Sequence, residues 1–111
     1  MDKFYVIGIR HNPQLGDYLS KAVIAKAKVN KASITATFDD YGSPTSLKFS
    51  LTHDFTGEHY QIGNSNCVYG SYSYFGYSNK SDAINALKAW TTKPGSSAAR
   101  AEAAIAAFEA A

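Results

Sequence analysis

The chain has 111 residues, of which 45% are hydrophobic and 18% are charged, with a net charge of +2. This length suits a single domain, residues 1–111, and is too short for two hydrophobic cores. The small net charge alone does not argue for nucleic-acid binding, while the single cysteine excludes an internal disulfide and fits a reducing compartment.

The first residues predict a strand followed by a helix. Residues 3–10, KFYVIGIR, are β-branched and aromatic over the length of a buried strand. This apolar run is too short for a secretion signal or a membrane span, so we expect a cytoplasmic protein. Asn12 and Pro13 suit the N-cap and first position of a helix, and apolar residues recur after them at helical spacing. We therefore expect a helix over residues 13–28, with a strand hairpin as the alternative.

The next segment predicts an antiparallel meander. Apolar and polar side chains alternate in residues 33–38 and again in residues 47–52, a pattern typical of strands with one buried face. Between them DDYGSP supplies turn residues, so we interpret Asp39 and Asp40 as turn entry rather than as a paired-carboxylate acid–base site. A weaker strand at residues 58–62, EHYQI, completes the meander.

The stretch CVYGSYSYFGYSNKS, residues 67–81, predicts an aromatic strand that leads into a helix cap. In a strand over residues 68–78, successive side chains point to opposite faces. Phe75 has no polar group, so we expect its face to meet the helices. We expect the other face, with Tyr72 and Tyr74, to lie open beside Lys48, Ser50 and the threonines of the hairpin. Exposed tyrosines on a polar surface are typical of protein-binding sites. A bulge at a glycine of this strand would reverse part of the assignment. The predicted partner-binding residues are Tyr72, Tyr74, Lys48, Ser50 and Thr37.

Two helices are expected at the C-terminus. Ser81 suits the start of the first helix, and Pro94 with Gly95 ends it. An alanine-rich helix follows, capped by Ser96 or Ser97. The expected fold class is α+β, an antiparallel sheet of about four strands with a C-terminal helical hairpin packed on one face. The apolar side of residues 97–111 could complete this core or face a second chain in a homodimer.

No catalytic or metal motif stands out, so we expect a protein that is not an enzyme and has no cofactor. His53, Asp54 and His59 could converge on a metal ion, but their spacing matches no signature, and a polar turn uses the same residues. Cys67 with His59 could form a nucleophile and base, although nothing around the cysteine resembles an activating helix N-terminus.

A lysine cluster supports an alternative function. Lys21, Lys26, Lys28 and Lys31 precede the meander. Single-stranded nucleic acid is commonly held by a charged groove with stacking aromatic rings, and the tyrosine-rich strand could supply the rings. The other interpretation is a solvated lysine face.

Residues 78–108 carry a resemblance to a known family. Its motif consists of Trp90, Pro94-Gly95-Ser96, Arg100, Glu102 and Ala104. The pattern resembles the end of small anti-CRISPR proteins of Pseudomonas phages that inhibit the type I-F surveillance complex. The chain departs from this family by one residue fewer between the tryptophan and Pro-Gly-Ser, and by its extra segment at residues 13–28.

The resemblance implies both a fold and a function. The fold would be a four-stranded antiparallel sheet with two helices on one face. Members of the family are not enzymes; they bind the repeated backbone subunit of the RNA-guided complex and block pairing of the guide with target DNA. On this basis the chain would be a phage-encoded inhibitor with a protein partner, acting in the cytoplasm of a host bacterium.

Overall fold

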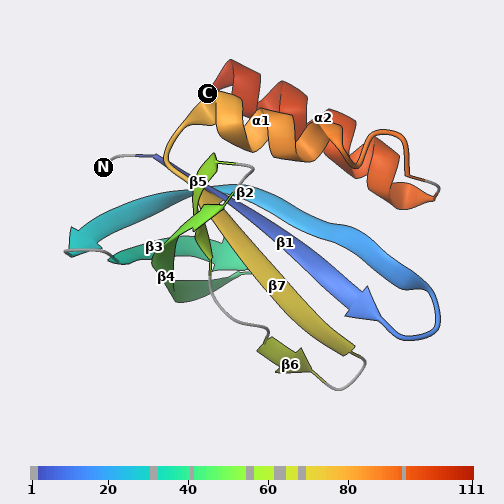
Figure 1. The fold of residues 1–111 in the computed structure, drawn as a ribbon, viewed down its shortest axis with the longest axis horizontal. Coiled ribbons are helices and arrows are strands. Elements are labelled where there is room, and N and C mark those ends of the chain that lie inside the picture. The colour runs from blue at the N-terminus through green and yellow to red at the C-terminus, as the bar shows by residue number, and fades with distance from the viewer. Residues whose placement is uncertain are drawn as a thin grey trace.

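The structure, a computed structural model, describes residues 3–30, 33–40, 42–54, 57–61, 65–67, 70–93 and 95–111. Within these ranges the side chains at residues 30, 40, 50–54, 57–61, 65–67, 70 and 71 are not described. The elements are β1 (Phe4–Asn12), β2 (Gly16–Asn30), β3 (Ser33–Asp40), β4 (Ser43–Asp54), β5 (Gly57–Gln61), β6 (Ser65–Cys67), β7 (Gly70–Tyr77), α1 (Lys80–Lys88) and α2 (Ser96–Ala110). The α+β class is confirmed, and both helices lie on one side of the sheet (Figure 1).

The strands form one antiparallel sheet that closes on itself. Each strand from β1 to β4 pairs with the next, β5 pairs with β7, and β7 pairs back with β1. The short β6 pairs with the start of β7, beyond the end of the β5 pairing. In the described part of the chain the sheet therefore has seven strands rather than about four, and closure gives it an inner face and an outer face.

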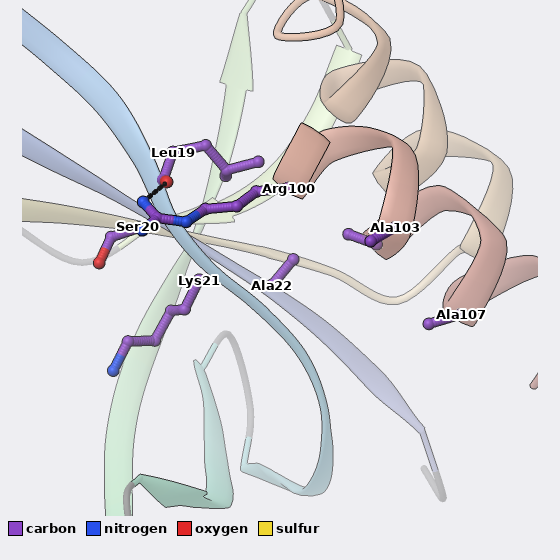
Figure 2. A pocket seen from close by; sticks show the side chains of 8 residues that line it. Leu19, Ser20, Lys21, Ala22, Arg100, Ala103 and Ala107 are labelled. Carbon is purple, nitrogen blue, oxygen red and sulfur yellow. Dashed lines mark hydrogen bonds between the residues drawn. The ribbon is translucent and has the colours of Figure 1, made fainter. Parts of the chain in front are cut away.

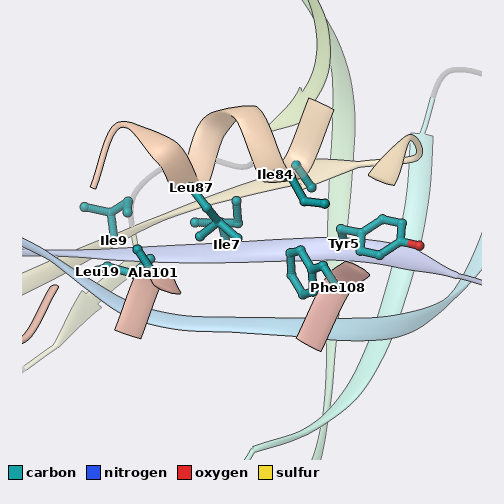
Figure 3. Close-up of a cluster of buried hydrophobic side chains, with 9 residues drawn as sticks. Tyr5, Ile7, Ile9, Leu19, Ile84, Leu87, Ala101 and Phe108 are labelled. Atoms are coloured by element: carbon teal, nitrogen blue, oxygen red, sulfur yellow. The ribbon is translucent and has the colours of Figure 1, made fainter. Parts of the chain in front are cut away.

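The strand β1 is buried on both faces. Phe4 and Val6 point inward, into a cluster with residues of β2, β3 and β4. Tyr5, Ile7 and Ile9 point outward, into a second cluster that the two helices complete (Figure 3). A strand that is buried on both faces needs apolar residues at successive positions, which explains the continuous apolar run FYVIGI.

The helix expected over residues 13–28 is wrong, because this segment is strand β2. Asn12 Oδ1 accepts hydrogen bonds from the backbone N–H groups two and three residues later, both at 2.9 Å. Gly16, with φ of 82°, then ends a three-residue loop and starts the return strand. The same Asn-Pro signal that can open a helix therefore opens a hairpin here, and pairing with β1 on one side and β3 on the other settles the alternative in favour of strands.

The meander expected over residues 33–62 is confirmed as β3, β4 and β5. Its first turn uses the predicted residues, since Asp39 Oδ2 accepts a hydrogen bond of 3.1 Å from the N–H of Gly42. Gly42 has a φ of 84°, a conformation that side chains with a Cβ rarely adopt. Asp39 therefore belongs to the turn.

The helical hairpin is confirmed, with different caps from those expected. Asn79, not Ser81, caps α1, and its Oδ1 accepts a hydrogen bond of 2.9 Å from the N–H of Ser81. Neither serine caps α2, which follows Gly95. The expected apolar faces are buried at Leu87 and Phe108, and Phe108 packs edge-on against Tyr5 of β1.

Replacing Gly76 by alanine is expected to lower the free energy of unfolding by about 1–3 kcal/mol. The new Cβ would overlap the ring of Phe4, which is fully buried and packs edge-on against Phe49. Gly8→Ala is the matched comparison: its Cβ would meet Lys21 Cγ at 3.0 Å and the Tyr74 ring at 3.1 Å, contacts that a shift of a few tenths of an ångström relieves, so a smaller loss is expected. Urea unfolding of both variants checks the prediction, and equal losses would contradict the inner packing.

Candidate binding surface

Two cross-strand rows of polar side chains lie on the outer face of β2, β3 and β4. The pairing aligns Lys28, Thr35 and Lys48 in one row and Lys26, Thr37 and Ser46 in the next. All six are exposed, and we call them the lysine–threonine face. Directly paired residues of antiparallel strands share a face, so three ammonium groups and three hydroxyls lie together on it.

The lysine–threonine face follows from alternation along β3. Ile34, Ala36 and Phe38 point into the inner cluster and are at least 93% buried. The intervening threonines therefore point outward, where their branched side chains suit a strand. The Thr37 and Ser46 hydroxyls are 3.0 Å apart, joining the two strands across the face.

The structure divides the five predicted binding residues between opposite faces of the sheet. Thr37 and Lys48 lie on the outer face as neighbours. Ser50 follows in β4, paired with Ser33 and Gln61, and its side chain lies outside the described residues. Tyr72 and Tyr74 lie on the inner face, because they alternate with Phe75, which packs against the helix-side cluster. The expectation that the tyrosines lie beside Lys48 is therefore wrong, and sheet closure is the reason.

The two tyrosines form a stacked pair that is half-buried. Their ring centroids lie 5.9 Å apart with an interplanar angle of 16°. Tyr74 packs against the inner cluster, and the Arg10 guanidinium lies 5.6 Å from the centre of the Tyr72 ring. The prediction that the two tyrosines lie on the face of their strand away from the helices is correct. This face, however, is the interior of the closed sheet. A binding role for the tyrosines stays a prediction.

A hydrogen-bonded chain joins Ser73, His11 and Asp17. The Ser73 Oγ lies 2.6 Å from His11 Nε2, and His11 Nδ1 lies 2.9 Å from Asp17 Oδ1. The order of groups is that of a serine–histidine–aspartate triad. However, Ser73 is 6% exposed and sits within a paired strand, so its oxygen is not accessible to a substrate. We interpret the chain as a polar link between β1, β2 and β7, and sequence spacing gave no signal for it.

The other sequence-based candidates have separate outcomes. The side chains of His53, Asp54, His59 and Cys67 lie outside the described residues, as does Lys31. Among the residues that the structure describes, no three histidines, cysteines or carboxylates group as metal ligands. The lysine cluster is divided between the two faces of the sheet. Lys26 and Lys28 lie on the outer face, whereas the Lys21 ammonium lies 5.9 Å from the centre of the ring of Phe38, which points inward.

Helix α2 is attached to β2 by two hydrogen bonds at one residue. The N–H of Leu19 donates to Ser97 Oγ at 3.1 Å. Arg100 Nη1 donates to the carbonyl oxygen of Leu19, also at 3.1 Å (Figure 2). The guanidinium also lies 5.9 Å from the centre of the Tyr18 ring. Ser97 and Arg100 thus have a structural role in this chain.

Comparisons of the chain with protein-family models, with curated proteins and with solved structures find no match. In the described part of the chain, no helix has the length and apolar character needed to cross a membrane.

Replacing Ser97 by alanine is expected to destabilise the fold by about 1–3 kcal/mol, because the buried N–H of Leu19 would lose its acceptor. The neighbouring Ser96 is exposed, so Ser96→Ala is a control with the same change in the same turn. Thermal and urea unfolding of the two variants measure the difference. A Ser97→Ala variant as stable as Ser96→Ala would show that this hydrogen bond does not hold α2 in place.

Proposed function

We propose that the chain is a non-catalytic inhibitor that binds a partner protein through the lysine–threonine face. The observation that carries the proposal is the alignment of exposed Lys26, Lys28 and Lys48 in neighbouring rows of one rigid sheet. The helices pack on β1, β2 and β7, on the opposite side of the molecule from β3 and β4 (Figure 1). The face is therefore available to another molecule.

The chemistry of the face favours an acidic partner surface. Neither cross-strand row contains a carboxylate, and Asp39 lies beside Lys26 at the end of the face, so the face as a whole is net positive. Complementary charge speeds association and excludes wrongly charged partners more than it adds affinity. The threonine side chains have few rotamers to lose on binding, which limits the entropic cost.

The resemblance of residues 78–108 supports a type I-F CRISPR surveillance complex as the partner. In this proposal the chain is phage-encoded, acts in the cytoplasm of the host bacterium, and blocks recognition of target DNA by occupying a protein subunit. It needs no cofactor. The resemblance concerns the helical hairpin, so it supports the partner independently of the lysine–threonine face.

Reversing the three charges is expected to weaken binding at least about 100-fold. Purified type I-F surveillance complex is immobilised, and binding of the wild-type chain and of the variant Lys26→Glu/Lys28→Glu/Lys48→Glu is measured by biolayer interferometry. Lys88→Glu, an exposed change on α1, is the control and is expected to bind as the wild type does. Unchanged binding of the triple variant would reject the face, and no binding of the wild type would reject this partner.

The same face supports a second candidate function, binding of single-stranded nucleic acid. Lys26 and Lys28 of the lysine cluster share it with Lys48, and phosphates are attracted by such charges. A salt titration with a single-stranded oligonucleotide separates the two functions. Affinity that falls steeply with salt, and that the triple variant abolishes, would favour nucleic acid. Absence of binding at low salt would remove this candidate.

A further inference from the structure

The first half of β2 has an edge that no described strand covers. Residues 16–25 pair with β1 on one side, and pairing with β3 begins only at Lys26. On the other edge of residues 16–25, no described strand is paired. At Leu19 both backbone groups on this edge are instead bonded by side chains of α2. The structure thus shows which way the edge faces, toward α2.

Beyond Leu19 the edge and the helix separate to form a groove. Its volume is about 400 Å³, and it runs between the strand and the helix in Figure 2. Residues 19–22 of β2 form one wall, and Arg100, Ala103, Ala104 and Ala107 of α2 form the other. Small side chains on both walls leave room beside the strand. The register of β2 against β1 also shifts at Ser20, a bulge of the kind that re-aims an edge.

We propose that this groove binds an extended, acidic segment of a partner protein as an additional strand on the edge of β2. Main-chain hydrogen bonds to a sheet edge supply affinity in this mode, and pockets for alternate side chains supply specificity. The strand wall of the groove ends at Ala22, and the edge continues beyond it to Ala25, before pairing with β3 begins. From Ser20 to Ala25 the edge is about 20 Å long, enough for six residues in extended conformation. The proposal rests on the groove and is independent of the lysine–threonine face.

The lining of the groove defines the chemistry of the segment. Side chains of an added strand alternate between two faces. On one face they would meet the alanines of α2, which accept small apolar residues. On the other they would lie beside Lys21, which points away from α2 in Figure 2. Both charged residues of the lining, Lys21 and Arg100, are cationic, and none is acidic. The fitting segment therefore turns small apolar residues toward α2 and places an acidic residue beside Lys21.

A phage-displayed library of random octapeptides, selected on the intact chain, tests the proposal without knowledge of the partner. Enriched peptides are expected to lack proline at positions whose nitrogen faces β2, because proline cannot donate to a ladder, and to carry an acidic residue. The best peptide is then synthesised and its dissociation constant measured by fluorescence polarisation. Failure to enrich such peptides would overturn the proposal.

Two changes on the protein locate the peptide. Ala103→Phe places a large ring in the groove and is expected to abolish binding, whereas Ala106→Phe, on an exposed position of the same helix outside the lining, is expected to leave it unchanged. Changing the peptide's acidic residue to its amide is expected to weaken binding about five-fold. In the Lys21→Gln variant, the same change in the peptide is expected to leave its affinity unaltered. Equal effects of the two phenylalanine variants would place the peptide elsewhere.

N-methylation distinguishes strand addition from simple occupation of the groove. Methyl groups on the peptide nitrogens that face β2 are expected to weaken binding by about ten-fold or more, since each removes a hydrogen bond. Methyl groups on the alternate nitrogens are expected to have little effect. Equal effects of the two methylation patterns would contradict an added strand. The triple lysine variant should still bind the peptide, so failure here and failure of the proposed function are separate results.

Discussion

Pairing of β1 with β7 is the constraint on which the rest of the structure depends. It runs from Tyr5 opposite Tyr77 to His11 opposite Ser71 and joins the first strand of the chain to the last. With it the strands form a closed sheet, and β1 acquires neighbours on both edges and an apolar cluster on each face. Without it β1 would be an edge strand with a continuous apolar sequence, a form prone to aggregation. Closure thus gives the inner cluster and the helix-covered cluster a common strand.

Closure also decides which side chains can meet a partner. Aromatic residues of β7 that would be exposed on an open sheet become part of the interior, as the stacked Tyr72 and Tyr74 show. The free outer surface is that of β3, β4 and the second half of β2, which the helices leave exposed. The helices in turn need β2 as a support, and Ser97 and Arg100 bind its unpaired edge at Leu19. The same edge, a few residues further, is left for another strand.

Local signals predicted the parts of the fold that local interactions form. The structure has the expected alternation along β3 and β4 and the expected turn at Asp39 and Gly42. It also has the expected helical hairpin with an alanine-rich second helix. The helix predicted at residues 13–28 failed because Asn12 and Pro13 open a helix or a hairpin equally well, and the partner strand decides. The prediction that Tyr72 lies beside Lys48 failed for a similar reason. Alternation shows which side chains of one strand share a face, but it does not show which strands will be neighbours. Closure of the sheet brings together segments more than sixty positions apart, such as His11 and Ser73. No local pattern encodes that contact.

Amide hydrogen exchange tests closure of the sheet most directly. The central amides of β1 and β7, such as those of Ile7 and Phe75, are paired within the ring and lie against a core. We expect them to exchange only through global unfolding, with a free energy of exchange equal to the free energy of unfolding measured in urea. Exchange of these amides through local opening, at a clearly lower free energy than amides of β3 and β4, would contradict a sheet closed by β1 and β7.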